Sequence, residues 1–247
     1  MIFFGIDIGS NTAKGALLKD NQIIASSVVP AGFRHDETAR KVLQDLLDDT
    51  RLQFEQVTRV VSTGYGRKSV SFSHKAVTEI ICHAAGAALL HPGLGGIVDV
   101  GGQDSKAIRL GEDGQVTDFA MNDKCAAGTG RFLEVMAGTL GLGLDQMGPR
   151  GLQSENPVKI SAICTVFAES EVITMIAAQK ERADIIAGIH ESAAQRIAGL
   201  AKKAKLTAPL MMTGGVALNP GLVHALEQAL GQTLLVHPLC QKMGAVG

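Results

Sequence analysis

Short apolar runs alternate with turn residues along the first ninety positions, and their spacing distinguishes strands from helices. Runs of β-rich sequence predict strands over residues 2–8, 13–18, 22–29 and 57–62. Apolar positions at helical spacing predict helices over residues 37–47 and 79–90. The glycine-rich stretch at residues 92–96 then interrupts the pattern, so we expect a domain boundary there.

The same rhythm then starts again. Strands are predicted over residues 97–100, 106–110, 115–120, 210–213 and 233–236. Helices are predicted over residues 130–140, 166–178, 185–204 and 220–230. Hairpins mixed with crossover helices indicate an α/β chain. We expect two domains, residues 1–93 and 94–247, with the final segment a candidate to return to the first.

An internal duplication explains the restart. Residues 6–14 align without gaps on residues 98–106, and both read apolar, Asp, apolar, Gly, small, amide, polar, small, Lys. One Asp-x-Gly turn alone is more often an ordinary hairpin. Because each copy also opens a run of three predicted strands, the matched pair favours duplication over chance.

Composition and charge limit the functions to consider. Apolar residues make up 46% and charged residues 19% of 247 residues, which is typical of a globular chain. A formal net charge of −1 gives no electrostatic basis for binding nucleic acid or an acidic membrane. The apolar N-terminus has no preceding basic stretch, and the longest apolar region is interrupted by polar residues and Pro92. We therefore expect a cytoplasmic protein that does not bind a membrane.

The duplicated turns have the chemistry of a phosphate site. Small residues at a strand end let backbone N–H groups hold phosphate oxygens. The turns supply Gly9, Ser10, Asn11, Thr12, Ala13 and Lys14 on one side, and Gly101, Gly102 and Gln103 on the other. If the turns face each other, Asp7 and Asp99 converge as oxygen ligands for a Mg²⁺ on the same polyphosphate.

A third glycine turn follows the strand at residues 210–213. Gly214 and Gly215 end the strand, and Asn219 with Pro220 has the pattern of a helix start. Bare backbone there would let a flat ring system lie against the turn. Taken alone, a tight strand-to-helix connection explains the turn equally well.

Two of the four cysteines precede predicted helices. Cys125 follows Lys124, and Cys164 comes just before the helix expected at residues 166–178. A helix N-terminus favours a thiolate and an anionic cluster bound to it, although two buried thiols are an alternative. Cys82 is expected in the core, and Cys240 has no evident partner. A closed metal site usually needs four ligands. The simplest arrangement is therefore a two-fold dimer in which Cys125 and Cys164 of each chain meet across the axis.

These motifs together resemble known families. The three turns are similar to those of the sugar kinase, Hsp70 and actin ATPase superfamily, in which two duplicated RNase H-like domains close on ATP. The runs MNDKCAAGTGRFLEVMA at 121–137 and CTVFAESEVI at 164–173 resemble the activator ATPases of 2-hydroxyacyl-CoA dehydratases. STGYGR at 62–67 and GGQD at 101–104 extend this likeness. The ATPase subunits of benzoyl-CoA reductases belong to the same family.

The resemblance implies an ATP-driven electron donor. It implies a homodimer with one [4Fe–4S] cluster between subunits, held by Cys125 and Cys164 of each chain. MgATP hydrolysis would drive an electron into a dehydratase or related iron–sulfur reductase, with a ferredoxin or flavodoxin as the upstream donor. Gln103 or Asp104 would position the attacking water. The remaining nucleotide residues would be Gly214, Gly215, Asn219 and Gln241.

The chain also departs from this family. Asn11 and Ala13 stand where the family often has Thr, which removes hydroxyl groups from the first turn. The chain stops at Gly247, where the family's last helix would begin, so we expect a truncated C-terminus.

Two rival functions follow from the same fold. A small-molecule kinase, such as an amino-sugar kinase, needs an acceptor pocket and a base but neither Cys125 nor Cys164. An ATP-dependent regulator or scaffold needs no redox chemistry. The seven histidines form no ligand pair, and we expect them at the surface or satisfied in the core.

Overall fold

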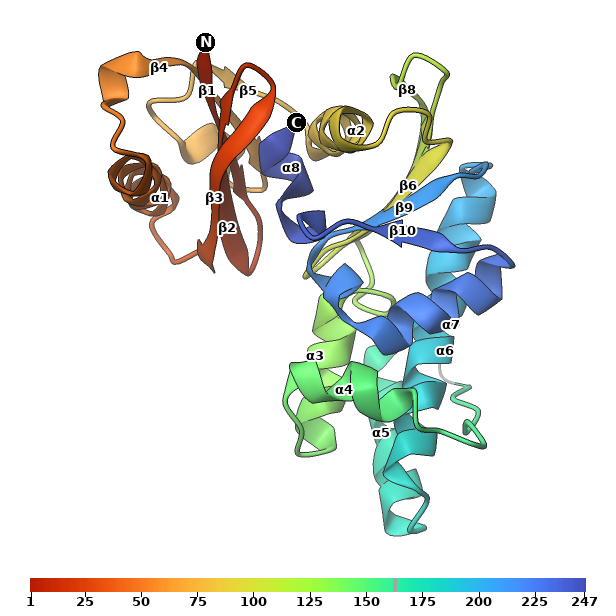
Figure 1. Ribbon diagram of the computed structural model, residues 1–247. Coiled ribbons are helices and arrows are strands. Elements are labelled where there is room, and N and C mark those ends of the chain that lie inside the picture. Colours follow the sequence, from red (N-terminus) through yellow and green to blue (C-terminus); the bar gives the residue numbers. More distant parts are fainter. Residues whose placement is uncertain (162–163) are drawn as a thin grey trace.

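The computed structural model describes residues 1–161 and 164–247, and the chain forms two α/β units, each built on a five-stranded sheet (Figure 1). The strands of the first sheet are β1 (Ile2–Ile8), β2 (Thr12–Lys19), β3 (Gln22–Pro30), β4 (Val57–Gly64) and β5 (Lys75–Ala76). Those of the second are β6 (Gly96–Val100), β7 (Ser105–Leu110), β8 (Val116–Asn122), β9 (Leu210–Thr213) and β10 (Leu234–Val236). The predicted α/β class is confirmed.

The two sheets share one topology. The first has the order β3-β2-β1-β4-β5, and the second, read from its other edge, has the order β8-β7-β6-β9-β10. In each, three antiparallel strands are followed by two parallel ones. The register also matches, since Asp7 lies opposite Lys14 and Asp99 lies opposite Lys106. The structure therefore supports the duplication inferred from residues 6–14 and 98–106.

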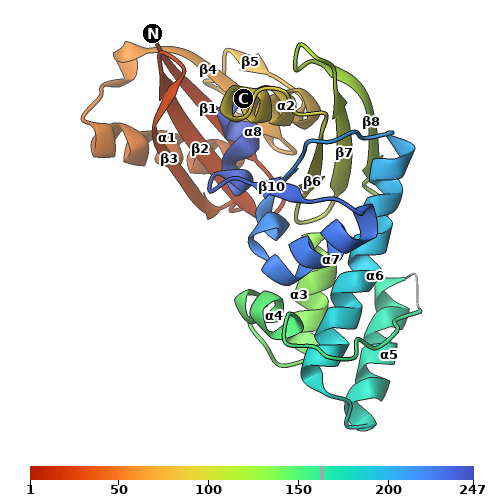
Figure 2. The same cartoon turned by 45° about the vertical axis from the view of Figure 1, so that its right-hand side comes forward.

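Helices complete both units. They are α1 (His35–Thr50), α2 (Glu79–Leu90), α3 (Gly130–Thr139), α4 (Leu144–Gly151), α5 (Thr165–Ala177), α6 (Arg182–Lys203), α7 (Pro220–Leu230) and α8 (Met243–Val246). One apolar stripe of α1, which includes Val42 and Leu46, packs on the first sheet. Between β8 and β9 the chain forms α3 to α6, which gather beside the second sheet and away from the first unit (Figures 1 and 2).

Each unit gives one helix to the other. Although α2 follows β5 of the first sheet, its Ala84 and Ala87 pack against Ile97 and Ile108 of the second sheet. Conversely, α8 follows β10 of the second sheet but packs against β2 of the first. The two helices also contact each other between the sheets (Figure 1). This exchange fixes the ends of β1 and β6 relative to one another.

Most predicted elements occur within a few residues of their expected bounds, but β5 and α4 were not predicted. A two-residue strand is too short to leave a periodic pattern. The sequence of α4 contains Pro149 and glycine, which disfavour helices. Burial of Met147 and close contact between Gly148 and Pro220 stabilise it instead, since a Cβ at Gly148 would lie 2.5 Å from Pro220 Cδ. Within the described ranges, no helix is long and apolar enough to cross a membrane.

Candidate functional site

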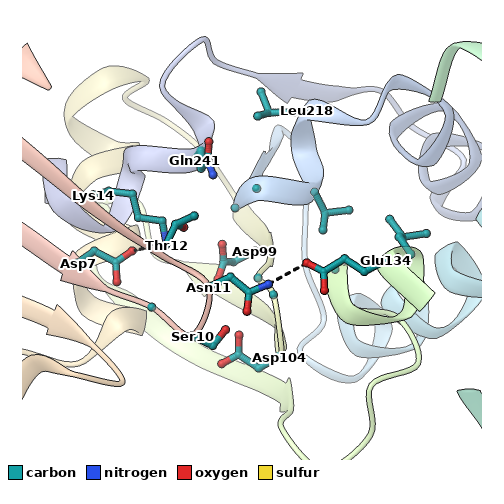
Figure 3. Close-up of a pocket in the computed structure, with 18 of the residues that line it drawn as sticks. Asp7, Ser10, Asn11, Thr12, Lys14, Asp99, Asp104, Glu134, Leu218 and Gln241 are labelled. Atoms are coloured by element: carbon teal, nitrogen blue, oxygen red, sulfur yellow. Dashed lines mark hydrogen bonds and ion pairs between the residues drawn. The ribbon is translucent and has the colours of Figure 1, made fainter. Parts of the chain in front are cut away.

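A cavity of about 590 Å³ lies between the two units, where β1 and β6 end (Figure 3). Most of the predicted nucleotide and magnesium residues line it, namely Asp7, Gly9, Ser10, Asn11, Thr12, Lys14, Asp99, Gly101, Gly102, Asp104, Gly214, Gly215, Asn219 and Gln241. The side chain of Ala13 instead lies in the core of the first unit. Gln103 is exposed and is not among the lining residues. The two duplicated turns therefore meet around one space.

The first turn places Asp7 at the cavity wall with an ammonium beside it. The backbone N–H of Gly9 donates to the carbonyl of Thr12 at 3.0 Å and closes the turn. Pairing of β1 with β2 puts Lys14 opposite Asp7, and Lys14 Nζ lies 3.3 Å from Asp7 Oδ2. The carboxylate thus keeps acceptor capacity for a cation, which hard oxygen ligands suit.

The second turn holds Asp99 more firmly. The N–H of Gly101 donates to the carbonyl of Asp104 at 2.9 Å, as in the first turn. The Thr213 hydroxyl donates to Asp99 Oδ1 at 3.0 Å, and His83 Nδ1 lies 3.3 Å from the same oxygen. Burial acts to raise the pKa of Asp99, but neighbouring His83 and Lys106 outweigh it and hold the pKa below its usual range.

Lys106 is the centre of a buried charge network. It is 3% exposed, and its Nζ lies 2.7 Å from Asp104 Oδ2, 2.8 Å from Glu79 Oε2 and 3.4 Å from Asp99 Oδ2. Burial acts to lower the pKa of Lys106, yet the surrounding carboxylates raise it above its usual value. The ammonium stays charged and offsets the negative charge of this wall.

The third turn requires glycine where it leaves the sheet. Gly214 has φ of +88°, and a Cβ there would lie 2.2 Å from the carbonyl oxygen of Val100. Gly64, at the end of β4, has φ of +87° and a similarly close approach to Ile8. Thr63-Gly64 is thus the counterpart of Thr213-Gly214 in the first unit. The sequence contains this signal, because Thr-Gly stands at the end of β4, and Thr213 at the end of β9 is followed by Gly214.

Several cavity residues were not predicted from the sequence. Glu79 and His83 lie four residues apart on α2, so they share one helix face, and both line the cavity. Tyr65 donates from the first unit to Asp104 Oδ2 at 3.4 Å. Asn11 Nδ2 donates to Glu134 Oε1 of α3 at 2.8 Å, also across the cavity (Figure 3).

Cys125 and Cys164 are both exposed, which excludes the alternative of two buried thiols. Cys125 lies in the loop between β8 and α3, where its backbone N–H donates to Asn122 Oδ1 at 3.3 Å. Cys164 is the N-cap residue of α5. Cys82 is buried, as predicted, and so is Cys240, and burial raises the pKa of both thiols. Of the four cysteines, only Cys125 and Cys164 are thus accessible to a ligand outside the chain.

The sequence pattern of the BadF/BadG/BcrA/BcrD ATPase family matches residues 4–247. The chain belongs to this family. Membership confirms the relationship expected from the cysteine motifs and the paired turns. It also supports the ATP and magnesium expected from those turns, because the family is one of ATPases.

Family members similar to this chain cover nearly all of it. The (R)-2-hydroxyglutaryl-CoA dehydratase activating ATPase of Acidaminococcus fermentans is 44% identical over 245 residues, 98% of this chain and 94% of that protein. The activator of lactoyl-CoA dehydratase of Anaerotignum propionicum is 45% identical over 248 residues, 100% and 95% of the two chains. The solved structure of the activator of the 2-hydroxyisocaproyl-CoA dehydratase from Clostridium difficile with bound ADPNP has a TM-score of 0.95 at 41% identity, covering 100% and 92%.

A distant structural likeness confirms the superfamily fold. The ROK family glucokinase of Streptomyces griseus has a TM-score of 0.59 at 12% identity, covering 100% of this chain and 97% of that one. At this identity the likeness shows the fold of duplicated RNase H-like domains and nothing about activity. The likeness to this glucokinase is therefore no argument for the kinase alternative. The dehydratase activators are far more similar to this chain, at more than 40% identity.

Proposed function

We propose that this chain is an ATP-driven electron donor that activates a 2-hydroxyacyl-CoA dehydratase or a related iron–sulfur enzyme. The observation that supports it most is that one chain of this ATPase family combines a cavity between two matched turns with two exposed cysteines. Relatives at 44% and 45% identity are named as activators of such dehydratases. Neither kinase chemistry nor a scaffold role needs these cysteines.

In this proposal MgATP occupies the cavity. The two turns hold the phosphates, and Gly214, Gly215, Asn219 and Gln241 line the adenosine side. Asp7 holds the magnesium ion, whereas Asp99, already bonded to Thr213, His83 and Lys106, shapes the wall. Gln103 or Asp104 orients the attacking water. Positioning and charge stabilisation suffice for phosphoryl hydrolysis, so no nucleophilic side chain is needed.

The cysteines fit an iron–sulfur cluster only when two copies combine. Among the described residues of one chain, no group of three or more His, Cys, Asp or Glu side chains is arranged so that it could hold a metal ion. Cys125 and Cys164 provide two accessible thiols per chain, so a homodimer supplies the four that such a cluster needs. A bound [4Fe–4S] cluster would supply one electron at a low potential. A ferredoxin or flavodoxin would be the upstream donor.

Contacts within the second unit connect the cavity to both cysteines. The first N–H groups of α3, those of Gly130 and Arg131, each donate at 2.8 Å to the carbonyls of Gly101 and Gly102 in the second turn. The Thr139 hydroxyl of α3 donates to Glu169 of α5 at 3.1 Å. Because the loop with Cys125 precedes α3 and Cys164 caps α5, a shift of the second turn would reach both thiols.

The cluster is tested on protein purified without oxygen. We expect about two iron atoms per chain, since one [4Fe–4S] cluster is shared by two chains. Cys125→Ser and Cys164→Ser should each lose the iron and the brown colour, whereas Cys82→Ser and Cys240→Ser are matched controls that keep both. Iron retained by both of the first two variants would contradict the assignment.

The coupling is tested by following the reduced dimer after addition of a 2-hydroxyacyl-CoA dehydratase. Electron transfer should require MgATP and should not occur with a non-hydrolysable analogue or without nucleotide. Asp7→Asn should keep iron and fold but lose ATP hydrolysis by about 100- to 1,000-fold, as expected when transition-state charge stabilisation is lost. Equal transfer under all three nucleotide conditions would overturn the proposed function.

A further inference from the structure

His190 lies behind the cavity wall, in the middle of α6. It is 1% exposed, and its Nε2 lies 3.2 Å from Nδ2 of Asn219. Asn219 lines the cavity, whereas His190 does not. His190 instead lines a second cavity of about 720 Å³, together with Gly151 and Gly221, so it touches the wall of the nucleotide cavity from behind.

The hydrogen-bond roles of this pair follow from the helix cap. The backbone N–H of Leu222 donates to Asn219 Oδ1 at 3.0 Å, which caps α7 and fixes the oxygen end of the amide. The NH₂ end must then face His190, so Nε2 of His190 accepts the hydrogen bond. A ring that accepts at Nε2 is neutral and carries its proton on Nδ1. Burial, which lowers the pKa of His190 to about 4, keeps the ring in this form.

Two glycines make room for the ring. A Cβ at Gly151 of α4 would lie 2.7 Å from Nδ1 of His190, and one at Gly221 of α7 would lie 2.6 Å from its Cε1. Any larger residue at these positions would displace the imidazole. Three helices are thus packed closely around one side chain, whose acceptor nitrogen is directed at Asn219.

We propose that His190 is a positioning residue for nucleotide binding, acting through Asn219. The Asn219 amide caps α7 with its oxygen, donates to His190 with its nitrogen, and lies at the cavity wall. Without the acceptor, the buried amide hydrogens lose their partner, and rotation of the amide to regain one would release the cap. The turn from Gly214 to Asn219 would then be loose before the nucleotide arrives. The proposal rests on nucleotide binding in this cavity, as proposed above, but not on the cluster or the partner enzyme.

The test is the affinity of the full chain for MgADP, measured by calorimetry. His190→Leu removes the acceptor and should weaken binding about tenfold, the size expected when a buried donor is left unpaired. His190→Gln places an acceptor oxygen near the position of Nε2 and should restore most of the affinity. In ATP hydrolysis the loss should appear in KM rather than kcat, because the contact serves binding.

A double-mutant cycle separates positioning from general stability. Asn219→Ala and the double variant His190→Leu/Asn219→Ala should bind MgADP equally, because His190 acts only through Asn219. Ile186→Ala is the matched control, since Ile186 is fully buried on the same helix and a Cβ at Gly151 would lie 3.0 Å from it. This control should lower Tm and leave the affinity unchanged. His190→Met repeats the test if leucine prevents folding.

The outcomes distinguish a failure of the role of His190 from a failure of the proposed function. Unchanged affinity in His190→Leu, or losses that add in the double variant, would overturn the role of His190 alone. A parent chain that binds no MgADP would overturn both this role and the proposed function.

Discussion

The two walls of the cavity are built on matching turns, yet they are held very differently. On the second unit, Asp99 is bonded to Thr213, His83 and Lys106, although its exposed fraction of 3% is close to the 5% of Asp7. On the first unit, the contact described for Asp7 is one ion pair with Lys14, and Asn11 is exposed. The two turns thus have matching backbones, but the side chains around Asp7 differ from those around Asp99.

This difference indicates a division of roles between the two walls of the cavity. A carboxylate surrounded by buried donors is already satisfied and serves as a fixed part of the wall. A carboxylate with one neighbouring ammonium retains lone pairs for a metal ion. The duplication alone gives Asp7 and Asp99 equivalent roles, whereas their surroundings favour Asp7 as the magnesium ligand. The second unit is then the rigid wall and the first unit the adaptable one.

The largest expected effect separates the two equivalent lysines. Lys106→Met would leave the carboxylates of Glu79, Asp99 and Asp104 close together without a cation. Breaking a buried pair in this way costs about 3–5 kcal/mol in the free energy of unfolding. Lys14→Met is the matched variant and should cost less, about 1–3 kcal/mol, because Lys14 has one acidic partner, although its side chain is 13% exposed and that of Asp7 is 7% exposed.

Urea denaturation at neutral pH measures both variants. A similar loss of unfolding free energy in the two would show that both walls are equally fixed, and the proposed division would be wrong. A larger loss of unfolding free energy in Lys106→Met than in Lys14→Met would support the proposed division between the two walls.

Local sequence patterns were sufficient for most elements, though not for β5 and α4, and for the glycine turns. The other strands of both sheets, the paired Asp-x-Gly segments and the turn at Gly214 are all marked by residues that are neighbours in the chain. The contacts that make the walls different were not predictable in this way. Glu79 and His83 reach Lys106 and Asp99 because α2 crosses to the sheet of the other unit, and its apolar pattern does not reveal which sheet it will cover.

The same limit explains why the sequence predicted His190 only as one of seven histidines that lie at the surface or are satisfied in the core. Its partner Asn219 lies 29 residues further along the chain, and the space for its ring depends on Gly151 and Gly221 of two other helices. No local spacing connects these positions, so the pair emerges only when α4, α6 and α7 pack together.

A smaller effect should appear when the rigid wall is titrated. The pKa of His190 falls from 6.5 to about 4 on folding because of burial, so the unfolded chain binds more protons between these pH values. Stability from the neutral ring is complete above about pH 6.5 and is lost as the pH falls toward 4, by about 3 kcal/mol in all.

His190→Gln removes this titration and is the control. The unfolding free energy of the parent chain, measured by urea denaturation, should fall more steeply than that of His190→Gln between pH 6.5 and 4. Parallel curves would mean that the ring titrates alike in the folded and unfolded chain, and that this wall is less closed than its burial indicates.

The smallest expected effect concerns the two hydrogen bonds that join the walls. Tyr65 reaches Asp104 at 3.4 Å, which is long for a hydroxyl donor, and Asn11 reaches Glu134 at 2.8 Å in an exposed position. Such bonds contribute about 0.5–1 kcal/mol each, so Tyr65→Phe and Asn11→Ala should weaken MgADP binding by only about two- to fivefold. Calorimetry on the single and double variants measures this, with Phe33→Ala as a surface control, since Phe33 is fully exposed in the first unit. If these two contacts act independently, the two losses should add. A loss of more than about a hundredfold in either single variant would show that the first wall is held as firmly as the second.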